Sequence, residues 1–357
     1  MKRLTSTAVL FALCALQQTF AAPPAFVDIT WMSISNMYYE LGPLNIVTDG
    51  YITRLPQDAF FGGGGGYAQT KRAFAPDVAA VTRVMNALGR PTRVNLLLTG
   101  HSHWDHSFDT ATWSTLTGAR IIGSKTTCLQ AQAESVPAER CRTINGGEVI
   151  SLSDGVTMRV VRWNHSGDPA VNPEQHNAVE LQAVPARDPA TGGLRAGVAE
   201  DFPNGGGNRA YLFTVDGPDG RFSWFFNNSA SAVDLHVPIV VDGVDYGAPI
   251  DNLKAAMRDA TLSAVDLWIG GSAVSVAKLV VPVLKPKAFL PVHWDGLFNA
   301  FEAGVPKPYA DAGVDALLTA SGVAVIKPAQ YMDKWRLDRT GVRPVANTEV
   351  KKALGFN

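Results

Sequence analysis

The chain has 357 residues, 46% of them hydrophobic, and a formal net charge of −1 from 31 basic and 32 acidic residues. This length allows two domains, but α/β folds of this size often form one, and no long linker interrupts the pattern. The balanced charge, without a basic run, gives no support for nucleic-acid binding. We expect a single domain and a small-molecule substrate; the oligomeric state stays open.

Residues 1–21 have the pattern of a signal peptide. Two basic residues and an apolar stretch from Ala8 to Leu16 are followed by small residues at Ala21 and Ala22. The apolar stretch is too short to span a bilayer, and no later segment approaches about twenty apolar residues. We therefore predict a mature chain of residues 22–357 that is periplasmic or secreted and has no membrane span.

Short strands are predicted between Ile29 and Asp49, followed by a loop with five consecutive glycines, Gly62 to Gly66. A helix is predicted to begin at Pro76-Asp77, since proline fits the first turn, and to end before Gly89. The apolar run 94–98 indicates a buried strand that Gly100 ends.

The later elements alternate in a way that favours a layered α/β sandwich. Residues 185–207 form a polar insertion, which predicts a long surface loop that shapes substrate access. Helices are predicted at 108–116, 125–135, 252–260 and 273–284, and strands at 120–122, 148–152, 156–163, 209–215, 222–226, 265–269 and 288–291.

The segment after the strand 94–98 holds His101, His103, Asp105 and His106 within six residues. Residues two apart in an extended chain point the same way, so His101 and His103 can face one cation. Asp105 and His106 lie where the chain turns into a helix, and they can face a second cation. These ligands suit zinc, with iron or manganese as alternatives. The competing interpretation is a polar loop with incidental histidines.

This motif, His-x-His-x-Asp-His, resembles that of the metallo-β-lactamase-fold hydrolases. The opening strands that end at Asp49-Gly50 and the stretch Leu290 to Asp295 are also similar to the family, and the likeness runs from about Asp28 to about Lys327. The resemblance implies a four-layer αββα sandwich. It is closest to the branch that includes ascorbate-lactone hydrolases and phospholipid phosphodiesterases.

The resemblance also implies a ligand set from distant segments. His165 would complete a first metal site with His101 and His103, and His293 would complete a second with Asp105 and His106. His176 competes with His165, but we expect it to be a solvated loop histidine. Asp49 would orient a ligand histidine through the ring nitrogen that does not touch metal, unless it is only a turn residue before Gly50.

At Asn227-Asn228-Ser229 the chain departs from the family pattern, because many relatives carry Gly-Asp-Thr with an aspartate that bridges two metals. A neutral amide is a weaker donor, so we expect one or two ions per chain, with the second weaker or conditional. Either Asn228 or Ser229 would bond the bridging water. Trp104 and Trp294 would form an apolar wall for the substrate, or serve packing alone.

Two cysteines follow the predicted signal peptide, Cys128 and Cys141. In an oxidising compartment they can pair, and a loop this short would stabilise the fold by roughly 3 kcal/mol. The alternative is two buried free thiols.

A half-open site of this kind indicates hydrolysis. A metal-bound hydroxide would attack an ester, lactone or amide carbonyl, with a β-lactam as a special case, and Asp105 would hold it and pass a proton to the leaving group. The alternatives are a phosphodiesterase of the same fold and a catalytically silent periplasmic metal-binding protein.

Overall fold

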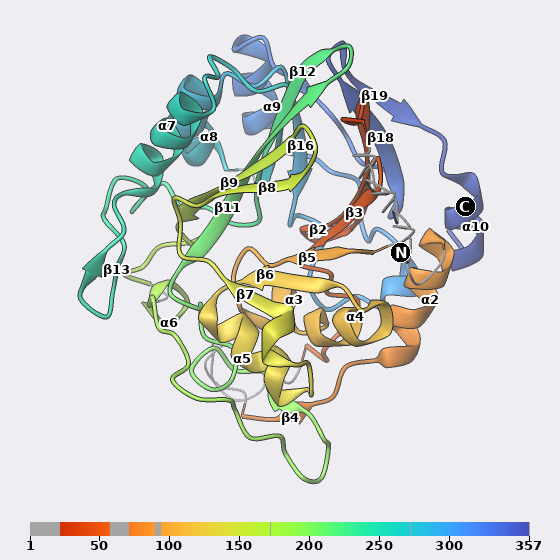
Figure 1. The fold of residues 1–357 in the computed structure, drawn as a ribbon, viewed down its shortest axis with the longest axis vertical. Helices are drawn as coiled ribbons and strands as arrows, with labels where there is room; N and C mark the ends of the chain where they lie inside the picture. The colour runs from red at the N-terminus through yellow and green to blue at the C-terminus, as the bar shows by residue number, and fades with distance from the viewer. Residues whose placement is uncertain (1–21, 58–70, 90–93, 172, 272, 357) are drawn as a thin grey trace, which may run out of the picture.

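Two mixed β-sheets pack face to face in the computed structural model, which describes residues 22–57, 71–89, 94–171, 173–271 and 273–356 (Figure 1). The first sheet has the order β19 (Gly341–Val345), β18 (Asp333–Asp338), β1 (Phe26–Ser33), β2 (Asn36–Leu41), β3 (Leu44–Thr48), β5 (Leu96–Leu98), β6 (Arg120–Gly123) and β7 (Cys141–Thr143). The second has the order β17 (Ala324–Val325), β16 (Ala288–Val292), β15 (Leu267–Gly271), β12 (Gly220–Asn227), β11 (Asn208–Gly217), β9 (Val156–Trp163) and β8 (Val149–Ser153).

Helices cover the outer face of each sheet, so the predicted four-layer αββα arrangement is confirmed (Figure 1). Outside the first sheet lie α2 (Val78–Leu88), α4 (Thr110–Thr117), α5 (Lys125–Ala133) and α10 (Thr348–Leu354). Outside the second lie α7 (Pro249–Asp259), α8 (Val274–Leu284) and α9 (Ala312–Ala320). Short elements are β4 (Ala73–Phe74), α3 (Trp104–Ser107), η3 (Ala138–Arg140), α6 (Pro173–His176), β10 (Leu194–Arg195), β13 (Val240–Val241), β14 (Val244–Asp245) and η4 (Phe301–Ala303).

Aromatic side chains fill the space between the two sheets. Tyr39 of β2 stacks on Trp224 of β12 with ring centroids 5.7 Å apart, and Phe213 of β11 contacts both rings, with centroids 4.5 Å from Trp224 and 6.0 Å from Tyr39. All three side chains are buried in one apolar cluster that both sheets share. Because most of the strands are covered on both faces, their sequences are apolar runs rather than strict alternations.

The local signals explain the helix boundaries. Asp77 caps α2 by accepting a hydrogen bond from the Ala80 N–H at 2.9 Å, and the helix ends before Gly89. The helix predicted over 108–116 corresponds to α4, which begins two residues later, and the motif residues before it form the separate short helix α3. The predicted signal peptide and the glycine-rich loop lie outside the described residues.

The C-terminal hairpin of β18 and β19 extends the first sheet beyond the predicted elements. Trp335 and Leu337 of β18 point inward at alternate positions, and β18 pairs antiparallel with β1. The strand is otherwise charged, as is usual near a sheet edge.

The prediction that 185–207 is a surface loop is wrong for its second half. Residues 201–207 are all buried beneath the histidine motif. The guanidinium of Arg209 donates to the carbonyls of Gly205 and Gly207 and to the Glu180 carboxylate, while Arg162 donates to Gly206. Two buried cations thus satisfy backbone carbonyls that a loop normally exposes to water.

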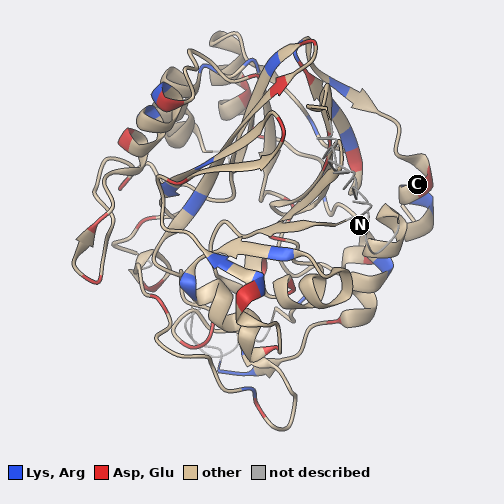
Figure 2. Cartoon of the chain, in the orientation of Figure 1, with Lys and Arg blue, Asp and Glu red and all other residues tan. Residues whose placement is uncertain are grey.

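Basic and acidic residues are interspersed along the chain, as the colours of the ribbon in Figure 2 show. Among the described residues, no helix combines the length and the apolar character needed to cross a bilayer.

Cys128 of α5 and Cys141 of β7 form a disulfide, with the sulfur atoms 2.01 Å apart. The bridge ties the last strand of the first sheet to the helix that covers it. The alternative of two free thiols is therefore wrong.

We expect the double variant Cys128→Ser, Cys141→Ser to lose about 3 kcal/mol of unfolding free energy, because its unfolded chain gains the entropy of an open loop. Urea denaturation of both proteins under oxidising conditions measures the difference. Reduction of the parent protein should reproduce the loss, and equal midpoints for all three samples would contradict it.

Candidate metal centre

The candidate site lies where strands of both sheets end. β3 ends before Asp49, β5 before His101, β9 before His165, β12 before Asn228 and β16 before His293. These strands are parallel in each sheet, so their carboxyl ends meet at one edge of the sandwich. Residues far apart in the sequence are thereby held by the rigid ends of short strands.

Gly100 allows this edge to close. A Cβ atom at this position would lie 2.2 Å from the Asn228 side-chain nitrogen, so the close approach of the two strand ends requires glycine. The Gly100 N–H also donates to the Asp49 carboxylate at 2.9 Å.

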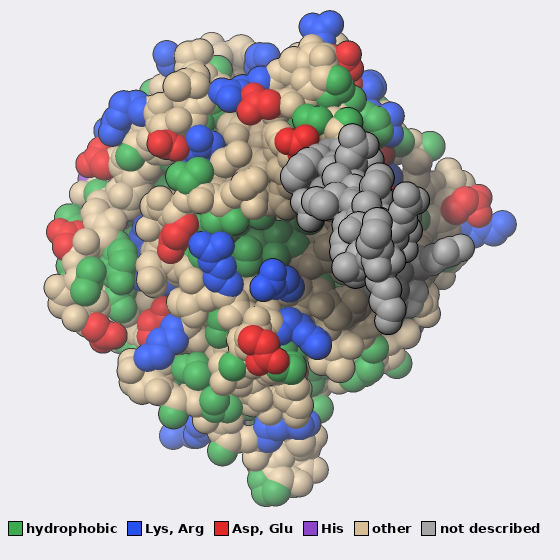
Figure 3. Space-filling model, viewed as in Figure 1, with side chains coloured by type: hydrophobic (Ala, Val, Ile, Leu, Met, Phe, Trp, Pro, Cys, Tyr) green, Lys and Arg blue, Asp and Glu red, His purple; other side chains and the backbone are tan. Residues whose placement is uncertain are grey.

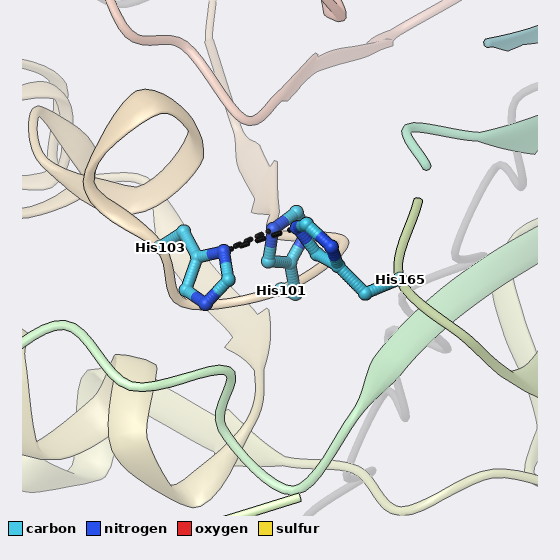
Figure 4. A group of neighbouring side chains, drawn as sticks. All are labelled: His101, His103 and His165. Carbon is cyan, nitrogen blue, oxygen red and sulfur yellow. Dashed lines mark hydrogen bonds between the residues drawn. The ribbon is translucent and has the colours of Figure 1, made fainter. Parts of the chain in front are cut away.

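Three imidazoles converge to form the first cluster (Figure 4). His101 Nε2 lies 3.1 Å from His103 Nδ1, which lies 3.2 Å from His165 Nε2. All three residues are buried. They are the first-site ligands expected from the sequence, and the structure brings them together.

The other ring nitrogens fix which atoms face inward. His101 Nδ1 lies 3.3 Å from the Asn228 Oδ1, and His165 Nδ1 lies 2.8 Å from the Ser166 carbonyl. Each contact places the proton on Nδ1, so both Nε2 lone pairs face the Nδ1 of His103.

This arrangement fits a divalent cation of the zinc type. Burial is the largest cause that lowers the pKa of His101 and His165 well below the usual value, and it lowers the pKa of His103 to about 3. The rings therefore remain neutral near pH 7. Without a cation, His103 Nδ1 can donate its proton to only one of the two Nε2 atoms, whereas a cation can bind the lone pairs of all three rings. Nitrogen donors in this number suit zinc, and three of them leave a coordination position open.

The second cluster contains Asp105, His106 and His293. The Asp105 Oδ2 lies 3.2 Å from His106 Nε2 and 3.1 Å from His293 Nε2. Ligand atoms of His101, Asp105 and His106 all lie within 4.8 Å of one another, so His101 borders both clusters. His293 is more open, with 26% of its side chain exposed.

Charge pairing distinguishes the second cluster from the first. Burial lowers the pKa of His106, but the carboxylates of Asp105 and Asp49 outweigh it and raise the value to about 10. Burial alone would raise the pKa of Asp105, yet the contacts with His106 and His293 hold it well below its usual range. In the absence of metal, His106 therefore carries a positive charge between the carboxylates of Asp49 and Asp105.

Asp49 lies beneath both clusters. Its Oδ2 accepts hydrogen bonds from Ser35 at 2.7 Å, from His106 Nδ1 at 2.9 Å and from the Asn228 amide at 3.0 Å. A carboxylate on the outer nitrogen of a ligand histidine fixes the ring and strengthens its donor atom.

Left-handed backbone occurs at three non-glycine positions around the site. Asp49 has φ of 58°, His293 of 65° and Ile34 of 47°. The His293 N–H donates to the Ile34 carbonyl at 2.9 Å, and the Asp295 carboxylate accepts from the Ile34 N–H at 3.0 Å. Such conformations persist only where the surroundings hold them, and they cluster at functional sites.

Asn228 does not occupy the expected bridging position. Its oxygen faces His101 Nδ1 and its nitrogen faces Asp49, so the side chain lies behind the histidine rings rather than between the clusters. Ser229 lines the cavity beside His293, as Asn228 does, and its Oγ accepts a hydrogen bond from the Ser166 N–H at 2.7 Å.

The two tryptophans beside the motif differ in role. Trp104 is 1% exposed and packs against Tyr51 and Phe298, so the prediction that it lines the substrate pocket is wrong. Trp294 lines a cavity of 210 Å³ beside His293, together with Ser166, Ser229, Gly271 and Ala273.

His176 was expected to be solvated, and this expectation is wrong. Only 6% of its side chain is exposed, and its ring meets that of His165 edge to face at 5.4 Å. Its Nδ1 lies 3.3 Å from the Asp234 Oδ2, and the other Asp234 oxygen accepts from Asn164 at 2.6 Å. Six of the seven histidines thus gather at this edge, whereas His236 is exposed.

Comparisons with known proteins find similarity to solved structures alone. No family model and no curated protein matches it. One solved structure that it resembles is the metallo hydrolase Igni18 from Ignicoccus hospitalis, with 13% sequence identity and a TM-score of 0.48 over 88% of this chain and 99% of that chain. Another is an isothiocyanate hydrolase from Delia radicum gut bacteria, with 10% identity and a TM-score of 0.48 over 86% of this chain and 98% of that chain. A third is the metallo-β-lactamase fold protein YhfI from Bacillus subtilis, with 8% identity and a TM-score of 0.47 over 87% of this chain and 99% of that chain.

The metal-stripped protein should lose stability on acidification, in part through His103. The pKa of His103 is about 3 in the folded chain, against a usual value of 6.5, so the unfolded chain binds the proton first. Its contribution therefore opposes folding increasingly as the pH falls from 6.5 towards 3.

Replacing His103 with Gln removes this contribution to the pH dependence of the unfolding free energy. The unfolding free energy of the variant, relative to the parent, should rise by roughly 2–3 kcal/mol between pH 7 and pH 4.5. Urea titrations of the stripped proteins at both pH values measure it, with His236→Gln as the exposed control. A difference between variant and parent that does not change with pH would refute the assignment.

Proposed function

We propose that the chain is a metal-dependent hydrolase of the metallo-β-lactamase type that opens an ester, lactone or amide bond in a small neutral molecule. The observation that carries the proposal is the pair of donor clusters, His101, His103 and His165 beside Asp105, His106 and His293, next to an open cavity. Metal ligands arranged at the rim of a small pocket are typical of hydrolytic sites.

Zinc is the proposed metal, and iron or manganese are the alternatives that nitrogen and carboxylate ligands also allow. A bound ion of this type supplies a Lewis acid and lowers the pKa of water to about 7. The first cluster offers three neutral nitrogens, whereas the second offers the Asp105 carboxylate, His293 and His106, and His106 must lose a proton before it binds.

Asp105 is the proposed catalytic carboxylate. Its low pKa keeps it ionised, and its contacts with His106 and His293 fix it at the boundary of the two clusters. From this position it can orient a water molecule and accept its proton. Trp294 provides an apolar wall beside His293.

The cavity lining favours neutral substrates. Among the described residues that line it, none is Lys or Arg, and the polar groups are serines, Asn228 and His293. Apart from a bound metal, these lining residues offer no cation to hold the negative charge of a phosphodiester, so the phosphodiesterase alternative is disfavoured. The volume of 210 Å³ limits the group that enters to a small one.

Asp105→Asn should lower kcat for the best ester or lactone by about 100-fold or more, because the variant cannot accept a proton. The measurement is a steady-state assay of zinc-loaded protein on aryl esters, lactones, a chromogenic cephalosporin and bis-aryl phosphates, with metal content determined in parallel. Asp154→Asn, in the exposed hairpin turn, is the control.

Two results would contradict the proposal. Preferred turnover of bis-aryl phosphates would favour a phosphodiesterase. No turnover of any substrate by protein with both clusters filled would favour a silent metal-binding protein.

We also propose that the chain is exported, since a disulfide at Cys128 and Cys141 needs an oxidising compartment. Expression of the full sequence in a bacterium should yield a periplasmic protein whose N-terminus lies near Ala22. Retention in the cytoplasm with residues 1–21 intact would contradict export.

A further inference from the structure

A second cavity lies at the opposite edge of the sandwich from the metal centre. It has a volume of 300 Å³ and lies between β6 and β7 of the first sheet and β8 of the second. Arg120, which begins β6, lines it, whereas the histidine motif follows the carboxyl end of the neighbouring parallel strand β5. Figure 3 shows hydrophobic side chains in this hollow and basic side chains around it.

Its rim carries excess positive charge. Arg120, Arg140 and Arg142 line the cavity, with Glu139 as the only carboxylate among its lining residues. Arg120 and Arg142 are exposed and form no ion pair with another described residue. Three cations around one opening repel one another and attract an anion.

Its floor is apolar and continuous with the core between the sheets. Leu96 of β5 and Ile150 of β8 are each 7% exposed, and Leu44 and Leu152 pack against the same cluster. The floor is reachable because β7 and β8 are the last strands of their sheets, so no further strand covers this side. An apolar floor beneath a cationic rim suits a ligand that has both an apolar part and an anionic group.

The disulfide makes this rim rigid. Cys141 lies between Arg140 and Arg142, and its bond to Cys128 anchors the segment to α5. The backbone that carries Arg140 and Arg142 is therefore held in place before any ligand arrives, which reduces the entropy lost on binding.

We propose that this cavity binds a single-chain amphiphilic anion, a free carboxylate with a linear alkyl tail. The tail would lie on Leu96, Ile150 and Leu152, and the carboxylate would lie among the three arginines. The volume is at the lower end of the range for small-molecule sites, about 300–1,000 Å³, and so suits one medium-length chain rather than a two-chain lipid.

Calorimetric titration of the disulfide-intact protein with hexanoate, octanoate, decanoate and decanol tests the proposal. The Kd should fall by about fourfold for each added methylene until the cavity is full. Decanol should bind at least about tenfold more weakly than decanoate, and added salt should weaken decanoate alone. Equal binding of decanol and decanoate, or a Kd independent of chain length, would overturn it.

Variants separate the two halves of the site. Arg120→Gln with Arg142→Gln should weaken decanoate about tenfold or more and leave decanol unchanged, whereas Arg258→Gln on the exposed face of α7 should have no effect. Leu152→Trp keeps the charges and fills the cavity beside Ile150, so it should abolish decanoate binding. Thermal melts verify that each variant folds, and full decanoate affinity in both cavity variants would place the ligand elsewhere.

Discussion

The convergence of three neutral imidazole lone pairs in a buried space is the constraint on which the rest of the structure depends. Without a cation, His103 Nδ1 can donate to only one of the Nε2 atoms of His101 and His165, so a buried lone pair is left without a partner. The fold must therefore hold them by other means. It does so with strand ends from both sheets, and with hydrogen-bond acceptors that fix the outer nitrogens of His101 and His165. The strained backbone at Asp49 and His293 is held by the same packed edge.

The two clusters respond differently to protons. The first is neutral near pH 7, so a cation can bind there without displacing protons from the ligands. In the second, the raised pKa of His106 means that a proton must leave before its Nε2 can bind a metal. Metal affinity at the second cluster should therefore depend more strongly on pH. Metal binding at the second cluster therefore depends on pH, and this dependence arises from His106 and not from the absence of a bridging carboxylate.

The sequence predicted the centre of the site because short-range geometry determines it. Alternation in an extended segment places His101 and His103 together, and the family resemblance placed His165, His293 and Asp49. The sequence did not predict the features that depend on packing between distant segments. His176 is buried because Asp234, from a distant loop, pairs with it. The end of the insertion is buried because Arg209 and Arg162 reach its carbonyls, and Trp104 is enclosed by Tyr51 and Phe298. In each case the deciding partner lies far away in the sequence.

The amide of Asn228, where many relatives carry an aspartate, matches the hydrogen-bonding groups that surround it. The side chain faces an N–H group on His101 and a carboxylate on Asp49, so it must accept one hydrogen bond and donate another. An amide does both, whereas an aspartate would place a second buried carboxylate against Asp49 and lose the donor. Gly100 completes the arrangement, because any larger residue would collide with this amide. The amide therefore belongs to the support of the first cluster, and the open positions between the clusters are bordered by Asp105 and His293.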